Sequence, residues 1–160
     1  MFDNVYDLEK RIGRINESGD GKVKKIRREI ETQECADVIR WARRTRIAGV
    51  LVAEYLTHVP NEGKRGKKAR SDFYRLGGQR GYPDYIFDIA RCGYHGLRIE
   101  VKAPKGYRSN IQDDQRKWES RLTGQGYLFV YCYCAEDMKQ LITDYLLDRI
   151  EGPTSGGDAA

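Results

Sequence analysis

The stretch from residue 81 to residue 102 reads GYPDYIFDIARCGYHGLRIEVK, and it decides the fold of this chain. Residues 85–90 and 97–102 are both rich in β-forming side chains, and the segment between them contains two glycines, which favour turns. The pattern predicts a β-hairpin. Folding the second strand back on the first returns Glu100 to the neighbourhood of Asp84.

Side-chain alternation along the second strand separates its charged residues from its apolar ones. Glu100 and Lys102 fall on one face because they are two residues apart. The opposite face, which we expect to be buried, carries Leu97, Ile99 and Val101.

Two carboxylates and an ammonium at one point are a typical arrangement of a metal-dependent nuclease. Neighbouring carboxylates repel each other unless a cation lies between them, and hard oxygen ligands suit Mg²⁺ or Mn²⁺ better than zinc. A metal at Asp84 and Glu100 would acidify a water, and Lys102 would orient that water or stabilise the developing charge. The alternative is an exposed hairpin with a cross-strand Glu and Lys pair that has no function.

A helix predicted between residues 24 and 46 supplies a third carboxylate. Its apolar stripe, at helical spacing, consists of Cys35, Val38, Ile39 and Ala42. Glu31 lies on the same stripe, where an unpaired carboxylate is costly unless a metal or a frayed helix end relieves it. Glu34, at the edge of the stripe, is the alternative for this role.

Several segments, taken in order, resemble one known family. They are Glu31 with Trp41, residues 59–65 (VPNEGKR), residues 81–84 (GYPD), residues 94–102 (YHGLRIEVK), and Gln115 with Trp118. This series resembles the VRR-NUC family of the PD-(D/E)xK nuclease superfamily, in its small stand-alone phage form, over roughly residues 31–147. The resemblance implies an α/β fold in which a mixed sheet is flanked by helices around a restriction-endonuclease-like core. It also implies a metal-ion-dependent phosphodiesterase that acts on DNA.

The resemblance assigns roles to individual residues of this sequence. The metal ligands would be Asp84, Glu100, the carbonyl of Val101, and Glu31, which acts directly or through water. Lys102 would be the catalytic lysine.

Gln115 would be the glutamine that the family places on the helix after the active-site strand. Family members often carry a serine three residues earlier, whereas this chain has Gln112. The helix is therefore expected to begin differently, with Ser109 or Asn110 as its cap.

The charge of the chain favours a polyanionic partner. Its formal net charge is +5 and its pI is near 9.0. One basic segment precedes the hairpin directly, and further basic residues flank the site. These candidate nucleic-acid contacts are Lys64, Arg65, Lys67, Lys68, Arg70, Arg80, Lys105 and Arg108. The alternative is that such a run is only a solvated face.

The length of the chain and its glycine-containing, polar end segments predict one nuclease domain at residues 22–150, an N-terminal extension at 1–21 and a disordered tail at 151–160. Six further elements are predicted between the first helix and the tail. In order, they are a strand at 54–59, a helix at 67–76, the hairpin at 85–102, a helix at 111–122, a buried strand at 127–133 and a helix at 136–147. Free cysteines and the lack of a signal peptide favour the cytoplasm, or the host cytoplasm for a phage protein.

The function predicted from these features is an Mg²⁺- or Mn²⁺-dependent endonuclease that is selective for DNA structure. Its substrate would be branched DNA, such as a Holliday junction or a flap, in replication, recombination or repair. A homodimer would suit a symmetric junction. The alternatives are a non-catalytic basic DNA-binding module and a ribonuclease of the same fold.

Overall fold

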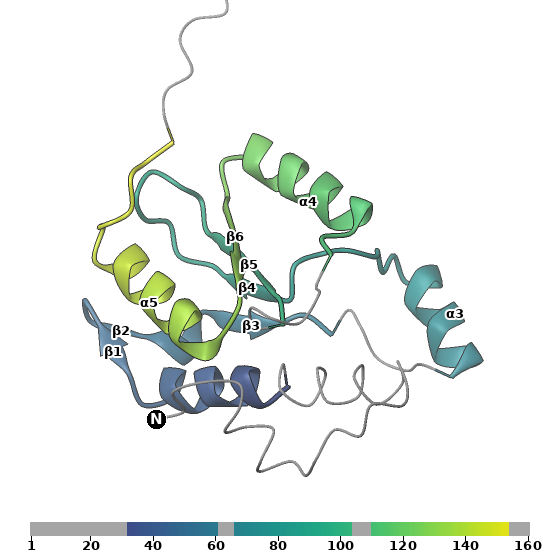
Figure 1. The fold of residues 1–160 in the computed structure, drawn as a ribbon, viewed down its shortest axis with the longest axis horizontal. Coiled ribbons are helices and arrows are strands. Elements are labelled where there is room, and N and C mark those ends of the chain that lie inside the picture. The colour runs from purple at the N-terminus through teal and green to yellow at the C-terminus, as the bar shows by residue number, and fades with distance from the viewer. Residues whose placement is uncertain (1–31, 61–65, 104–109, 154–160) are drawn as a thin grey trace, which may run out of the picture.

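A mixed four-stranded sheet organises the computed structural model, which describes residues 32–60, 66–103 and 110–153 (Figure 1). In order across the sheet, the strands are β3 (Leu56–His58), β4 (Tyr85–Phe87), β5 (Leu97–Val101) and β6 (Leu128–Cys132). The pairs β3–β4 and β4–β5 are antiparallel, and β5–β6 is parallel. The predicted hairpin is thus confirmed, with strands shorter than expected.

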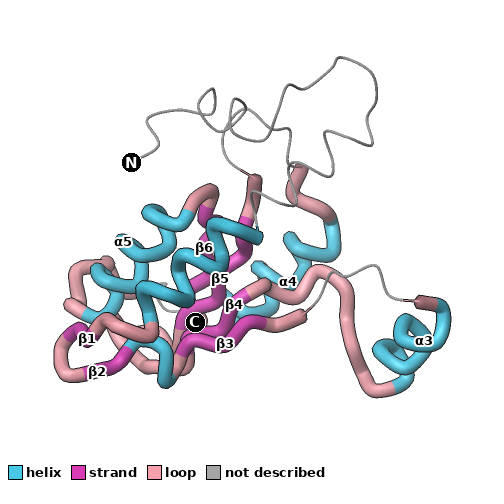
Figure 2. The backbone as a smooth tube through the Cα atoms, turned by 90° about the horizontal axis from the view of Figure 1, so that it is seen from below, coloured by secondary structure: helices cyan, strands magenta, loops and turns pink. Residues whose placement is uncertain are grey.

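Helices cover the two faces of the sheet. A helix at residues 32–42 and α5 (Ala135–Leu146) share one hydrophobic core with the apolar face of β5. On the other face lies α4 (Asp113–Gly124), which reaches the polar side of β5. Figure 2 shows the sheet from a second direction, with α3 (Lys67–Arg75) set apart from the other helices. The predicted α/β class with a mixed sheet between helices is therefore confirmed.

The first helix ends earlier than the sequence predicts. Residues 32–42 are helical, and the expected extension to residue 46 is wrong. Instead β1 (Arg46–Ile47) pairs with β2 (Val50–Leu51) around Ala48 and Gly49, both of which have positive φ, and the 3₁₀ helix η1 (Val52–Glu54) follows. A positive φ is uncommon for alanine, so the sequence carries only half of the usual signal for this turn.

The strand predicted at residues 127–133 is confirmed as β6, but the expectation that it is fully buried is wrong. The strand β6 lies at the edge of the four-stranded sheet, and only Cys132 within it is fully buried. Burial raises the pKa of the Cys132 thiol to about 12. The other residues of β6 are only half-buried, as expected for a strand that has a neighbour on one edge only.

The ends of the predicted domain are described in part. Residues 1–31 and 154–160, which include the predicted extension and most of the predicted tail, lie outside the described residues. Residues 151–153 are exposed, and the hydroxyl of Tyr94 donates to the carbonyl of Glu151 at 3.3 Å.

None of the described helices is long and apolar enough to cross a membrane.

Tyr145 joins α5 to the segment that follows β4. Its ring is fully buried and meets the ring of Phe87 edge-on. Its hydroxyl donates to the carbonyl of Ile89 at 2.7 Å and accepts from the N–H of Arg91 at 3.2 Å. These two bonds fix the start of the hairpin connection against the core.

We expect Tyr145→Phe to lower the free energy of unfolding by roughly 1–3 kcal/mol, because it leaves two backbone groups without their partner. The control is Tyr94→Phe, which removes an exposed hydrogen bond and should change the free energy by less than about 0.5 kcal/mol. Urea denaturation of both variants measures the difference. Equal stabilities would show that the Tyr145 hydroxyl does not hold the connection.

Candidate active site

Asp84, which directly precedes β4, lies close to Glu100 of β5. Tyr85 pairs with Ile99 in the antiparallel ladder, so the next step of the same register places Asp84 opposite Glu100. Directly opposed residues project from the same face of a sheet. One carboxylate oxygen of Asp84 also accepts from the N–H of Val101 at 2.9 Å. The structure thus brings the two predicted carboxylates together at one end of the hairpin.

Lys102 and Gln115 complete this cluster. The ammonium of Lys102 donates to Glu100 at 3.1 Å and to the side-chain oxygen of Gln115 at 2.6 Å. The amide nitrogen of Gln115 donates to the same oxygen of Glu100. Glu100 and Lys102 are only 4% and 7% exposed, so this is not the exposed cross-strand pair of the alternative interpretation.

Gln115 also determines where α4 begins. Its side-chain oxygen accepts from the N–H of Gln112, which is the N-cap of the helix, at 3.0 Å. The expected cap at Ser109 or Asn110 is therefore wrong. The side chain of Gln112 accepts from the N–H of Gln115 in return, so the two glutamines form a capping box in which glutamine stands where the family often has serine. One buried amide thus links the start of α4 to Glu100 of β5 and to Lys102, which directly follows that strand.

A clamp between α4 and residues 80–84 positions Asp84. The indole N–H of Trp118 donates to the carbonyl of Arg80 at 3.1 Å, and its ring meets Tyr82 edge-on with centroids 4.8 Å apart. Gly81 has a φ of +74°, and a Cβ there would lie 2.6 Å from the backbone of Asp114. Only glycine fits this close approach.

Two residues near the cluster were missed by the sequence analysis. Tyr131 pairs with Glu100 across the parallel ladder, its ring centroid is 6.0 Å from the Lys102 nitrogen, and its hydroxyl donates to Glu119 at 2.8 Å. Burial and this bond raise the pKa of Tyr131, so the phenol stays protonated at neutral pH. Tyr131 comes next to Glu100 only through the pairing of β5 with β6. Because these strands are far apart in the sequence, no local pattern predicts this pairing.

Arg98 is the second missed residue. It lies on the same face as Glu100, is almost fully buried, stacks over the ring of Tyr127 and pairs with Asp88 at 3.2 Å. Strand alternation alone places Arg98 on this face. Its bonds are directed toward β4 and the start of β6, so it supports the strand rather than completing the cluster.

The other predicted site residues divide into two groups. Those on or near α3, namely Lys67, Lys68, Arg70 and Arg80, are exposed. Those outside the described residues are Glu31, Lys64, Arg65, Lys105 and Arg108. Glu34, the alternative to Glu31, accepts from the N–H of Ala135 at the start of α5. This bond satisfies a helix N-terminus, which is a structural use of the carboxylate.

The oxygen donors of the cluster fit Mg²⁺ or Mn²⁺. Asp84 and Glu100 offer carboxylates, and the carbonyl of Val101 points to the same side as its N–H, toward Asp84. Across residues 32–60, 66–103 and 110–153, no group of three or more His, Cys, Asp and Glu side chains could hold a metal. The remaining ligands of a cation here would therefore be carbonyl, water or substrate oxygens, which hard cations accept.

Comparison with known proteins identifies the class. The family model of the VRR-NUC domain matches residues 24–136. The chain therefore belongs to the VRR-NUC family and has a nuclease-type fold, which confirms the resemblance seen in the sequence. A solved structure described as a "VRR_NUC domain protein" is 31% identical, with a TM-score of 0.62, covering 73% of this chain and 88% of that one. No curated protein matches the sequence.

We expect Gly81→Ala to disturb the site more than Gly49→Ala. Both glycines have positive φ, but the space around Gly49 is open. The Gly49 variant should cost about 1–2 kcal/mol from backbone strain alone, and the Gly81 variant more, because α4 or residues 80–84 must move. Hydrogen exchange at the Val101 amide, which Asp84 accepts from, should accelerate only in the Gly81 variant. Equal exchange in both would contradict the clamp.

Proposed function

We propose that this protein is a metal-ion-dependent endonuclease that hydrolyses phosphodiester bonds in DNA. The observation that carries the proposal is the opposition of Asp84 and Glu100 beside the buried ammonium of Lys102. A binding module has no use for two carboxylates that face a phosphate without a cation, because they would repel it. Membership of the VRR-NUC family, which suggests nuclease activity on DNA, supports the same conclusion.

Each residue of the cluster would have a separate role in phosphodiester hydrolysis. A divalent cation bound by Asp84, Glu100 and the carbonyl of Val101 would supply acidification of a water and neutralisation of charge on the phosphate. Lys102 would orient the attacking water or stabilise the charge that develops on the scissile phosphate. Gln115 is a positioning residue, since it holds both Glu100 and Lys102 through a single amide. Glu31 would add a further ligand, directly or through water.

DNA would be held by basic residues around the cluster. Arg80 and the cations of α3 are exposed on the described part of the chain, and the net charge of +5 favours a polyanion.

We propose branched DNA as the preferred substrate and a homodimer as the active form on a symmetric junction. A cleavage panel of labelled junction, flap, duplex and single-stranded DNA, and RNA, run with Mg²⁺, Mn²⁺ or chelator, tests the substrate and separates it from a ribonuclease. Sedimentation tests the dimer.

We expect Asp84→Asn and Glu100→Gln each to abolish cleavage, because an amide is a poor ligand for a hard cation. DNA binding should stay intact or tighten, since a negative charge that repels phosphate is removed. The control is Glu136→Gln, which neutralises a carboxylate that is 81% exposed in the first turn of α5 and should cleave like the wild type. Cleavage at the wild-type rate by either site variant would rule out the site. Tight binding without cleavage by the wild type, in every metal, would leave a non-catalytic DNA-binding module.

We expect Lys102→Met to lower the single-turnover rate by about a hundredfold or more, the size expected for a group that stabilises charge in the transition state. Methionine keeps the length of the side chain and removes its charge. Mn²⁺ affinity measured by calorimetry should stay near that of the wild type, since the carboxylates remain. Melting with Mn²⁺ present checks that the variant is folded. A folded, metal-binding and fully active variant would show that the lysine is only a structural partner of Glu100.

A further inference from the structure

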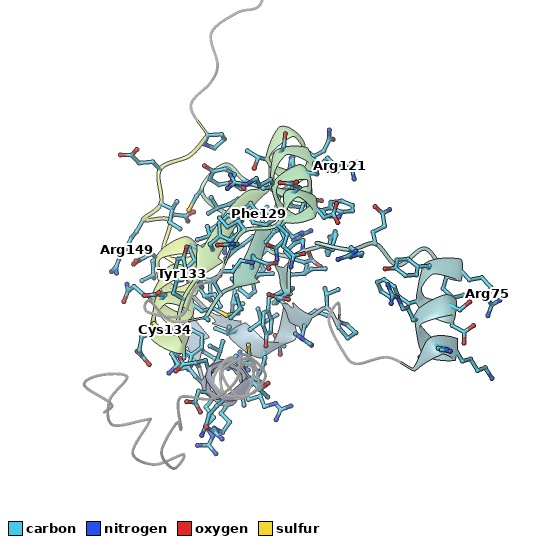
Figure 3. The ribbon with its side chains drawn as sticks, turned by 45° about the vertical axis from the view of Figure 1, so that its right-hand side comes forward. Arg75, Arg121, Phe129, Tyr133, Cys134 and Arg149 are labelled. Atoms are coloured by element: carbon cyan, nitrogen blue, oxygen red, sulfur yellow. The ribbon has the colours of Figure 1, made fainter. Side chains whose placement is uncertain are left out.

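The helix α3 has no buried residue, which distinguishes it from α4 and α5. It lies to one side of the body in Figures 1 and 2, and Figure 3 shows Arg75 on its outer side. A helix of nine residues is marginally stable in water unless it packs against something. An external partner would supply that stabilisation.

One face of α3 is built from hydrogen-bond donors. By helical spacing, Lys67, Lys68, Ser71, Tyr74 and Arg75 share this face, and all five are exposed. The first turn of the helix contains no acidic residue. The acid of the helix, Asp72, is paired with Arg75 at 3.0 Å. Donors and positive charge of this kind complement a phosphate backbone.

Leu76, the C-cap residue of α3, projects into solvent. It is 78% exposed, which is more than any other exposed large hydrophobic residue of the described chain. Gly77 has a φ of +86° and turns the chain there. A Cβ at Gly78 would lie 2.4 Å from the ring of Phe73, so this turn packs on Phe73. The N–H of Gly78 also donates to the carbonyl of Phe73 at 2.8 Å. The turn therefore covers Phe73 and leaves Leu76 outside.

We propose that α3 and Leu76 form a docking surface for DNA with an open base step, in which α3 binds phosphates and Leu76 enters the step. Apolar side chains inserted between bases, next to cationic side chains on the backbone, are an established way to hold kinked DNA. This inference rests on DNA as the substrate in the proposed function. It adds a reason for a preference for junctions and flaps, whose bases are already unstacked at the branch.

The connection from α3 to the cluster suits such a role. Asp84 follows Leu76 by eight positions in the chain, a span of at most about 28 Å when extended. The last part of this connection is clamped to α4 by Trp118. The length of this connection therefore limits how far DNA bound by α3 can lie from the carboxylates of Asp84 and Glu100.

Leu76→Ala and its matched control Leu147→Ala test the apolar contact. Leu147 is also exposed, at 39%, but it follows α5. The probe is a branched DNA with 2-aminopurine at the branch, titrated in chelator so that no cleavage occurs. Wild type and Leu147→Ala should raise the fluorescence by unstacking the probe base, and Leu76→Ala should lose most of this rise. Its affinity for branched DNA should fall about tenfold, with little change on intact duplex.

A second pair of variants tests the phosphate contacts. Replacing Lys67 and Lys68 with glutamine should reduce the slope of log affinity against log salt by about two, because each contact releases roughly one counterion. The control replaces Lys139 and Arg149, which lie by α5, and Figure 3 shows Arg149 on the side of the molecule away from Arg75. The control should leave the slope unchanged, and so should Leu76→Ala.

Unchanged fluorescence and affinity in Leu76→Ala, or an unchanged slope in the double variant, would overturn the docking surface even if the wild type cleaves DNA. If the wild type binds as expected but cleaves no substrate, the docking surface stands and the nuclease assignment fails. Sedimentation of Leu76→Ala is the last check. A change from dimer to monomer would assign Leu76 to a contact between copies and would also overturn the proposal.

Discussion

The ammonium of Lys102, buried between Glu100 and Gln115, is the interaction on which the rest of the site depends. Removing charged groups from water is expensive, and a buried pair is tolerated only when further hydrogen bonds satisfy it. Gln115 supplies these bonds, and the same amide caps α4. The first turn of α4 must therefore lie over the end of β5. That position in turn requires Gly81, since any other residue would collide with Asp114.

The strand β5 carries two separate tasks on its two faces. Leu97 and Ile99 are fully buried against α5 and the first helix, and they belong to the hydrophobic core. Arg98, Glu100 and Lys102 are nearly as buried on the other face, but among polar partners: Arg98 pairs with Asp88, whereas Glu100 and Lys102 bond to Gln115 of α4. The core fixes the position of the strand, and the strand then fixes the charged side chains. Rigid strands hold such groups more accurately than loops do.

The parts of the fold that were predicted correctly have local signals. Alternation in residues 97–102 and the glycines before them are sufficient for the hairpin and for the face that Glu100 and Lys102 share. The parts that were missed depend on contacts between distant segments. Tyr131 reaches Lys102 through the parallel pairing of β5 with β6, and Trp118 reaches Arg80 across the fold. The turn at Ala48 was missed for another reason, because its backbone conformation is unusual for alanine.

Formal charge explains why the proposed chemistry needs each of these groups. Asp84, Glu100 and Lys102 together carry one negative charge, which would repel a phosphodiester. A divalent cation would change this to one positive charge, and the single negative charge of the scissile phosphate would then neutralise the site. Without Lys102, the same cation would leave a neutral site that becomes negative when the phosphate binds. Because the cluster is buried, such differences are screened less than at the surface, so the lysine matters for the charge that grows as the phosphate reacts.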